Sequence, residues 1–102
     1  MKLSSRIVQR TLAYVNKLRK LQGRKPLKRM PKGRPMMITA CPVAKALTSP
    51  FGNATARTSS KHGPQIIFYD RVGRHHIVRG PKYVNDFMEA FDCSYIPELI
   101  ER

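Results

Sequence analysis

The stretch QIIFYDRVGRHHIVRG, residues 65–80, decides the fold, because it contains two runs typical of β-strands separated by a short turn. Residues 65–69 and 75–79 are rich in β-branched and aromatic side chains, which favour extended structure. Residues 70–73 between them end in a glycine, as expected of a turn. The sequence therefore predicts an antiparallel hairpin. Residues 54–59, rich in Thr and small side chains, are a candidate third strand, so the sheet is expected to have two or three strands.

The alternation of side chains along these strands predicts which face is buried. If Ile66 and Phe68 face the core, Tyr69 lies on the other face of the sheet. We expect Arg57 and Arg74 to accompany Tyr69 on that exposed face, where they could contact nucleic acid.

A helix is predicted directly after the hairpin, from Pro81 to about Asp92. Apolar residues follow the helical i, i+3, i+4, i+7 spacing there, at Val84, Phe87, Met88 and Phe91. Residues 95–100 are expected to form a short closing turn or helix whose apolar side chains pack back onto the domain.

Upstream of the sheet, residues 3–22 carry the clearest helical periodicity. Their apolar side chains occupy one half of a helical wheel, while Lys2, Arg6, Arg10, Lys17 and Lys20 fall within a narrow arc of the other half. Gly23 follows as a suitable left-handed terminator. The arc contains no Asp or Glu to form i, i+4 pairs, which favours a binding role; an ordinary solvated helix face is the competing interpretation.

Residues 23–37 contain three prolines and two glycines among many cations, so we expect a mobile, extended connector. Within it, Pro31-Lys32-Gly33-Arg34-Pro35 resembles the core of an AT-hook, which lies in the minor groove of A·T-rich DNA. The resemblance implies that Lys32 and Arg34 enter the groove. Met36, Met37 and Ile38 stand where that motif has further basic residues, and turn chemistry alone is the competing explanation.

Pro42 is suited to the first position of a helix, so a short helix is predicted from Pro42 to Leu47 or Thr48. Together these elements predict a single α+β domain over residues 1–102. Its expected order is an amphipathic helix, a basic connector, a short helix, two or three antiparallel strands and a C-terminal helix.

Charge is distributed very unevenly along the chain. Residues 1–69 hold 15 of the 20 Lys and Arg residues and none of the six Asp and Glu residues, and the net charge is +14. The N-terminal portion cannot neutralise its own cations, and nucleic acid is the commonest external polyanion that can do so.

We therefore predict a non-enzymatic nucleic-acid-binding protein, with DNA favoured over RNA. The candidate phosphate-binding residues are Lys2, Arg6, Arg10, Lys17, Lys20, Arg24, Lys25, Lys28, Arg29, Lys32 and Arg34. Two alternatives stay open: a ribosomal or RNA-binding protein, and a small phage-type protein that binds and inhibits a host protein.

Enzymatic and metal-dependent functions have little support in the sequence. Three histidines and six late carboxylates form no recognisable catalytic pattern, and the cysteines and histidines lack the spacing of a structural zinc site. Cys41, at the start of a predicted helix, is a candidate nucleophile. A small buried thiol without a catalytic role is the preferred interpretation. We expect no cofactor, and free thiols at Cys41 and Cys93.

Several short motifs also resemble a family. Val15-Asn16, the basic connector, residues 40–47, Phe91-Asp92 and Pro97-Glu98-Leu99 are similar to small uncharacterised proteins of actinobacteria and their bacteriophages. The resemblance implies a setting, a bacterial cytoplasm, and no activity. The lack of an apolar run of bilayer length agrees with a cytoplasmic, non-membrane protein.

Overall fold

A computed structural model describes residues 2–101, with side chains placed from Arg6 onward. Its first element, α1, spans Lys2–Leu21 and is followed by α2, Pro42–Leu47. Three strands come next, β1 (Thr55–Arg57), β2 (Gln65–Tyr69) and β3 (His75–Arg79), and then α3 (Lys82–Asp92). A 3-10 turn, η1 (Pro97–Leu99), lies near the end. The predicted α+β class and element order are confirmed.

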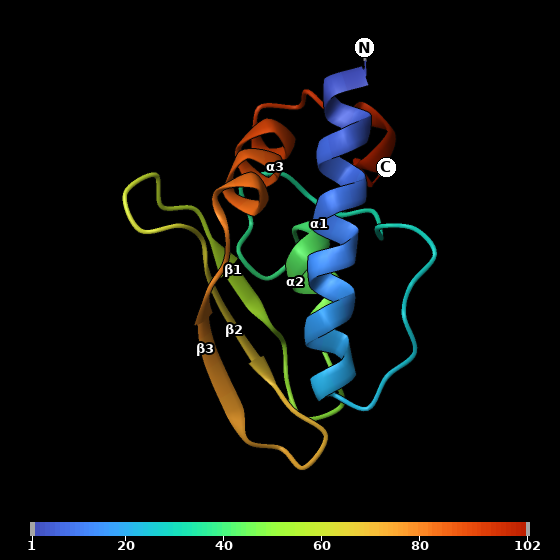
Figure 1. The fold of residues 1–102 in the computed structure, drawn as a ribbon, viewed down its shortest axis with the longest axis vertical. Coiled ribbons are helices and arrows are strands. Elements are labelled where there is room, and N and C mark those ends of the chain that lie inside the picture. Colours follow the sequence, from blue (N-terminus) through green and yellow to red (C-terminus); the bar gives the residue numbers. More distant parts are fainter. Residues whose placement is uncertain (1, 102) are drawn as a thin grey trace.

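The strands form one antiparallel sheet in the order β1-β2-β3. The helices lie together on one side of this sheet, with α1 alongside α3 and in front of α2 (Figure 1). Ile66 and Phe68 are fully buried beneath them, as predicted. They pack in a core with Phe87 and Phe91 of α3, whose burial follows from their helical spacing.

Local sequence signals explain where the helices begin and end. Gly23 has φ +67°, the left-handed conformation that suits a helix terminator. Pro42 begins α2 after the extended residue Cys41. Pro81 is the N-cap of α3, and Cys93 follows its last turn. The helix α1 forms as predicted, but one of its apolar side chains is not buried. Leu21, which falls on the apolar half of the helical wheel, is 50% exposed.

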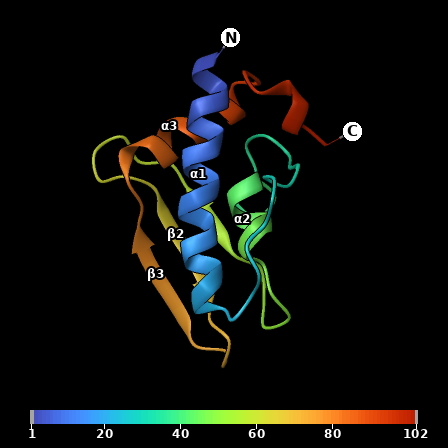
Figure 2. The same cartoon turned by 45° about the vertical axis from the view of Figure 1, so that its right-hand side comes forward.

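The connector after α1 has no helix or strand, but side chains attach it to the rest of the domain. The Asn16 amide donates to the Leu27 carbonyl at 3.0 Å and accepts the Leu27 N–H at 2.8 Å. Met30 is buried in the core. The segment runs back along α1 from its C-terminal end (Figure 2). Its predicted mobility stays a prediction.

The C-terminal residues pack onto the domain only in part. Ile96 is buried and Leu99 and Ile100 are partly buried, which agrees with the predicted closing turn, whereas Tyr95 is 74% exposed. Within residues 2–101, no helix combines the length and the apolar character needed to cross a bilayer.

Candidate nucleic-acid interface

The basic arc predicted on α1 forms a continuous exposed stripe. Arg6, Arg10, Lys17 and Lys20 are all exposed, whereas Leu12, Val15 and Leu18 on the opposite side are buried. At 1.5 Å per helical residue, the stripe from Arg6 to Lys20 is about 21 Å long. Lys2, the remaining candidate on this helix, has a side chain outside the described residues. The stripe is thus long enough to follow several phosphates of a nucleic-acid backbone.

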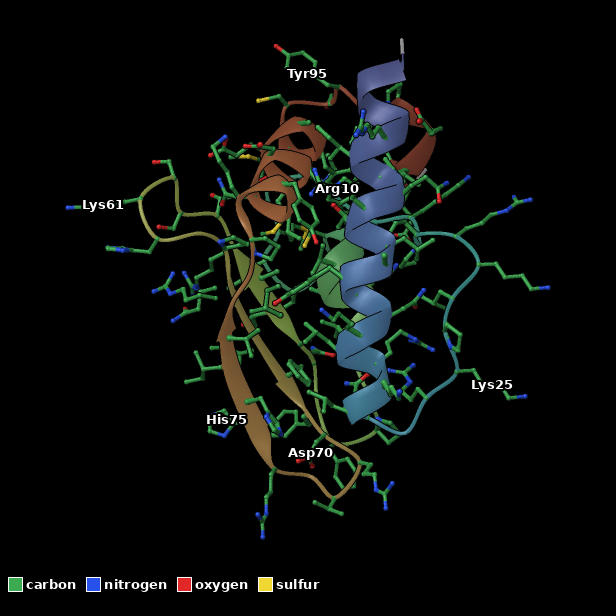
Figure 3. All side chains as sticks on the ribbon, in the orientation of Figure 1. Arg10, Lys25, Lys61, Asp70, His75 and Tyr95 are labelled. Atoms are coloured by element: carbon green, nitrogen blue, oxygen red, sulfur yellow. The ribbon has the colours of Figure 1, made fainter. Side chains whose placement is uncertain are left out.

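One member of the stripe is held in place by a neighbouring helix. The Arg10 guanidinium lies over the Tyr83 ring of α3, 4.1 Å from the ring centroid, between the two helices (Figure 3). A cation–π contact keeps the positive charge and orients the side chain. Arg10 can therefore contact a phosphate with less loss of side-chain entropy than a fully mobile arginine.

The connector brings a second group of cations next to α1. Lys25, Lys28, Arg29 and Lys32 are exposed, and Lys25 points away from the domain (Figure 3). Lys28, Arg29 and Lys32 border a groove of about 410 Å³ that is also lined by Val8, Gln9 and Leu12 of α1. The same groove contains Glu98, which is one carboxylate among three cations. We call the α1 stripe and these connector cations together the helix face.

Two predicted phosphate-binding residues are already engaged within the protein. The Arg24 guanidinium donates to the Thr48 carbonyl at 2.8 Å and to the Gln22 side chain at 3.2 Å. Arg34 forms an ion pair with Glu101, at 3.4 Å between Nε and the carboxylate oxygen. These two arginines are less available to an external anion than the others.

Arg19 shows that one cation of α1 has a structural role. It is 8% exposed, and its guanidinium donates to the carbonyls of Ala46 at 2.7 Å and Lys25 at 3.0 Å. Burial is the main cause that lowers its pKa, with the nearby charge of Arg24 second. The sequence patterns predicted no role for Arg19, and its structural role follows from tertiary contacts with residues 25 and 46.

The AT-hook-like motif is not free to enter a DNA groove, because its glycine pairs with the C-terminal segment. Gly33 is buried and pairs with the C-terminal segment: its N–H donates to the Leu99 carbonyl at 2.8 Å, and its carbonyl accepts the Glu101 N–H at 2.8 Å. A glycine must approach the floor of a DNA groove for this motif to insert. Groove insertion by Lys32 and Arg34 would thus require residues 99–101 to move away.

The carboxylates near the C-terminal end of the chain pair mainly with cations outside the helix face. Asp70 binds His76, Asp86 binds Lys82, and Glu101 binds Arg34 and Lys45. Of the candidate cations whose side chains the structure describes, only Arg34 forms an ion pair with a carboxylate. The positive charge of the N-terminal portion therefore remains available to an external partner.

The sheet contributes cations that the candidate set left out. Arg57, Gln65 and Arg79 are cross-strand neighbours on the side of the sheet away from the helices. The register places Arg79, and not the predicted Arg74, on the same face as Arg57 and Tyr69. Arg74 precedes β3, where its N–H donates to Asp70 in the turn. Strand alternation from Phe68 would have identified Arg79, once the turn had fixed which residues pair.

Cys41 does not resemble a catalytic nucleophile. Cys41 and Cys93 are both free, and burial raises the pKa of the Cys41 thiol. A reactive cysteine requires the opposite shift, toward thiolate. Within residues 2–101, no group of three or more His, Cys, Asp and Glu side chains is arranged to hold a metal ion.

Comparisons with family models, with curated proteins and with solved structures find no match to this chain.

Proposed function

We propose that this protein binds duplex nucleic acid, with DNA favoured, through phosphate contacts made by its helix face. The observation that carries the proposal is the exposed α1 stripe, Arg6, Arg10, Lys17 and Lys20, which is flanked by connector cations and pairs with none of the carboxylates in the described part of the chain. Phosphate contacts of this kind supply affinity without reading the base sequence. Weak sequence preference follows.

Geometry also supports a contact with an extended backbone. The stripe is straight because it follows one helix, and the connector, which carries further cations, runs along the side of α1 (Figure 2). Duplex DNA carries one charge about every 1.7 Å of its axis, so a 21 Å stripe lies opposite many phosphates. An A·T bias through Lys32 and Arg34 is a further, smaller component, since it depends on displacement of residues 99–101.

The test is a fluorescence anisotropy titration of a labelled DNA duplex at several salt concentrations. The variant Arg6→Gln/Lys17→Gln/Lys20→Gln removes three stripe cations, and we expect it to lower the slope of log affinity against log salt by about three. Lys61→Gln/Arg74→Gln/Lys82→Gln is the matched control, because it removes the same charge outside the helix face.

Absence of duplex binding by the native protein at low salt would refute the proposal. Equal slopes for the two triple variants would show that total charge, and not the helix face, controls binding. Competition with structured RNA measures the preference between the two nucleic acids. A pull-down from nuclease-treated bacterial lysate tests the host-protein alternative, since a protein partner survives the nuclease and a nucleic-acid bridge does not.

A further inference from the structure

The sheet has one face that no helix covers. Figure 1 shows α1, α2 and α3 gathered on the same side of the strands, and His75 points away from them (Figure 3). The side away from the helices, which we call the outer sheet face, consists of Thr55, Arg57, Gln65, Ile67, Tyr69, His75, Ile77 and Arg79. At one end of this face the Tyr69 ring packs against Gly52.

The strand register arranges these side chains in three rows across the sheet. Arg57, Gln65 and Arg79 form the first row. Thr55, Ile67 and Ile77 form the second, and Tyr69 and His75 form the third. Successive rows are about 6.7 Å apart, because two strand residues separate them. The face therefore has a cationic end, an apolar centre and an aromatic end.

The centre of this face is unusually apolar for a solvated surface. Ile77 is 58% exposed and lies directly opposite Ile67 on the neighbouring strand. Next to them, the Tyr69 and His75 rings lie 6.1 Å apart between centroids, tilted by 51°. Aromatic rings and aliphatic side chains on an open sheet are suited to contact the faces of unpaired bases.

The charged side chains of the outer sheet face itself are all of one sign. Arg57 and Arg79 are both exposed, and the eight residues of the face include no Asp or Glu. The Arg79 guanidinium uses one N–H to donate to the Gly63 carbonyl at 3.2 Å, which positions it at the edge of the sheet. Lys61, at the tip of the β1–β2 loop, extends beyond the same end (Figure 3). A ligand of this face must combine planar apolar groups with negative charge.

We infer that the outer sheet face binds single-stranded nucleic acid, with bases stacked on Tyr69, His75 and the Ile67–Ile77 pair and phosphates contacted by Arg57 and Arg79. A duplex cannot use this face in the same way, because its bases are stacked against one another inside the helix. The inference goes beyond the proposed function and does not depend on it, since duplex binding uses the opposite side of the molecule.

A second copy of the chain fits this face poorly. Two outer sheet faces packed together would bring Arg57 and Arg79 of both copies into one interface without a carboxylate from either face. Like charges brought together in this way oppose association. A single strand supplies the missing negative charge and the planar groups in one ligand.

Two exposed aliphatic residues provide a matched pair of variants. Ile77→Glu places a carboxylate in the centre of the outer sheet face, and Val72→Glu makes the same change in the β2–β3 turn, where Val72 is 65% exposed. The probes are labelled eight-nucleotide oligomers of dT and of U, titrated by anisotropy. We expect Ile77→Glu to weaken binding at least tenfold and Val72→Glu to weaken it less than threefold. Similar losses for the two variants would overturn the inference.

Tyr69→Leu tests stacking separately from charge. Leucine keeps an apolar side chain against the sheet but removes the ring, and we expect a loss of about 5- to 150-fold, the range for one stacked base. Circular dichroism and the melting temperature establish that each variant is folded. If Tyr69→Leu does not fold, His75→Leu makes the same test at an exposed position.

Photocrosslinking of the native protein gives an answer that does not depend on any variant. An oligomer containing 4-thiouridine should crosslink to peptides of β2 and β3, and crosslinks confined to α1 and the connector would overturn the inference. So would a dimer in solution whose formation excludes the oligomer. If the native protein does not bind duplexes but the oligomer still crosslinks to β2 and β3, the proposed function is refuted and this inference is not.

Discussion

The helix face and the outer sheet face are both basic, but they differ in what surrounds the charge. On α1, Arg6, Arg10, Lys17 and Lys20 form a stripe of exposed cations, and the Tyr83 ring beside them is covered by Arg10. On the sheet, Arg57 and Arg79 flank an exposed isoleucine and an aromatic pair. Charge alone is suited to a phosphate backbone, whereas charge beside planar apolar groups is suited to unpaired bases. The net charge alone therefore does not distinguish the kinds of ligand that the two faces are suited to bind.

The largest expected difference between the two faces is in how strongly salt lowers their affinity for nucleic acid. If six to ten helix-face cations neutralise phosphates, duplex affinity should fall by about three to five powers of ten between 50 and 200 mM salt. Oligomer binding should fall much less, because it uses fewer cations and because stacking releases no counterions. Parallel titrations of the two probes at four salt concentrations measure both slopes. Identical slopes would contradict the distinction between the faces.

Two adjacent cations of α1 give the next largest effect, this time on stability. Arg19 donates to two carbonyl groups in a buried position, whereas Lys20 is exposed. Arg19→Met leaves those carbonyls without a donor and should lower the free energy of unfolding by roughly 1–3 kcal/mol. Lys20→Met should change it by less than about 0.5 kcal/mol while lowering the duplex salt slope by about one.

Urea unfolding and duplex titration of both variants check this pair. The opposite pattern, with Lys20→Met destabilising and Arg19→Met affecting only binding, would show that the two cations have been assigned the wrong roles.

Local signals account for much of what the sequence predicted. The alternation at Ile66 and Phe68 identified the buried face of β2, because a strand repeats every two residues regardless of its surroundings. Pro42 and Gly23 marked helix ends through backbone restrictions that act within a few residues. The stripe on α1 followed from helical periodicity for the same reason.

Contacts between distant segments could not be predicted in this way. Gly33 meets Ile100 only because the chain returns at its C-terminal end. Arg34 and Arg24 are engaged by Glu101 and by the Thr48 carbonyl, partners set by tertiary packing. The placement of Arg79 on the outer sheet face required the strand register, which the hairpin turn determines.

Acid should weaken the turn between β2 and β3, where Asp70 is ionised and hydrogen-bonded. The Asp70 carboxylate binds His76 at 2.8 Å and accepts the N–H groups of Val72 and Arg74. The hydrogen bond from His76 is the main cause that lowers the pKa of Asp70. A depressed pKa in the folded state means that Asp70 stabilises the fold above its unfolded pKa, about 3.9. This contribution is lost as the pH falls through the folded value.

Asp70→Asn should therefore lower the melting temperature at pH 7, and the difference from the native protein should disappear at pH values below both pKa values. Thermal melts between pH 2 and 7 measure that difference. A difference that stays constant over the whole range would exclude ionisation of Asp70 as its cause.

Glu101 offers the smallest and most local test, because in the described part of the chain it pairs only with Arg34 and Lys45, which lie outside the helix face. Its carboxylate binds Arg34 and Lys45, and the hydrogen bond from Lys45 is the main cause that lowers the pKa of Glu101. The side chain is therefore ionised at neutral pH and occupies the place that a phosphate would take. Glu101→Gln should raise duplex affinity about two- to fivefold, the range for one exposed ion pair.

The matched control is Glu89→Gln, which changes the net charge equally at an exposed position on α3. If both variants raise affinity to the same extent, long-range charge explains the gain, and Glu101 does not compete with phosphate at Arg34. If Glu101→Gln gives the larger gain, and gives it preferentially on A·T-rich duplexes, release of Arg34 is coupled to the AT-hook-like motif. That outcome would distinguish the AT-hook-like motif from the other candidate cations, because only its cations would contribute sequence preference.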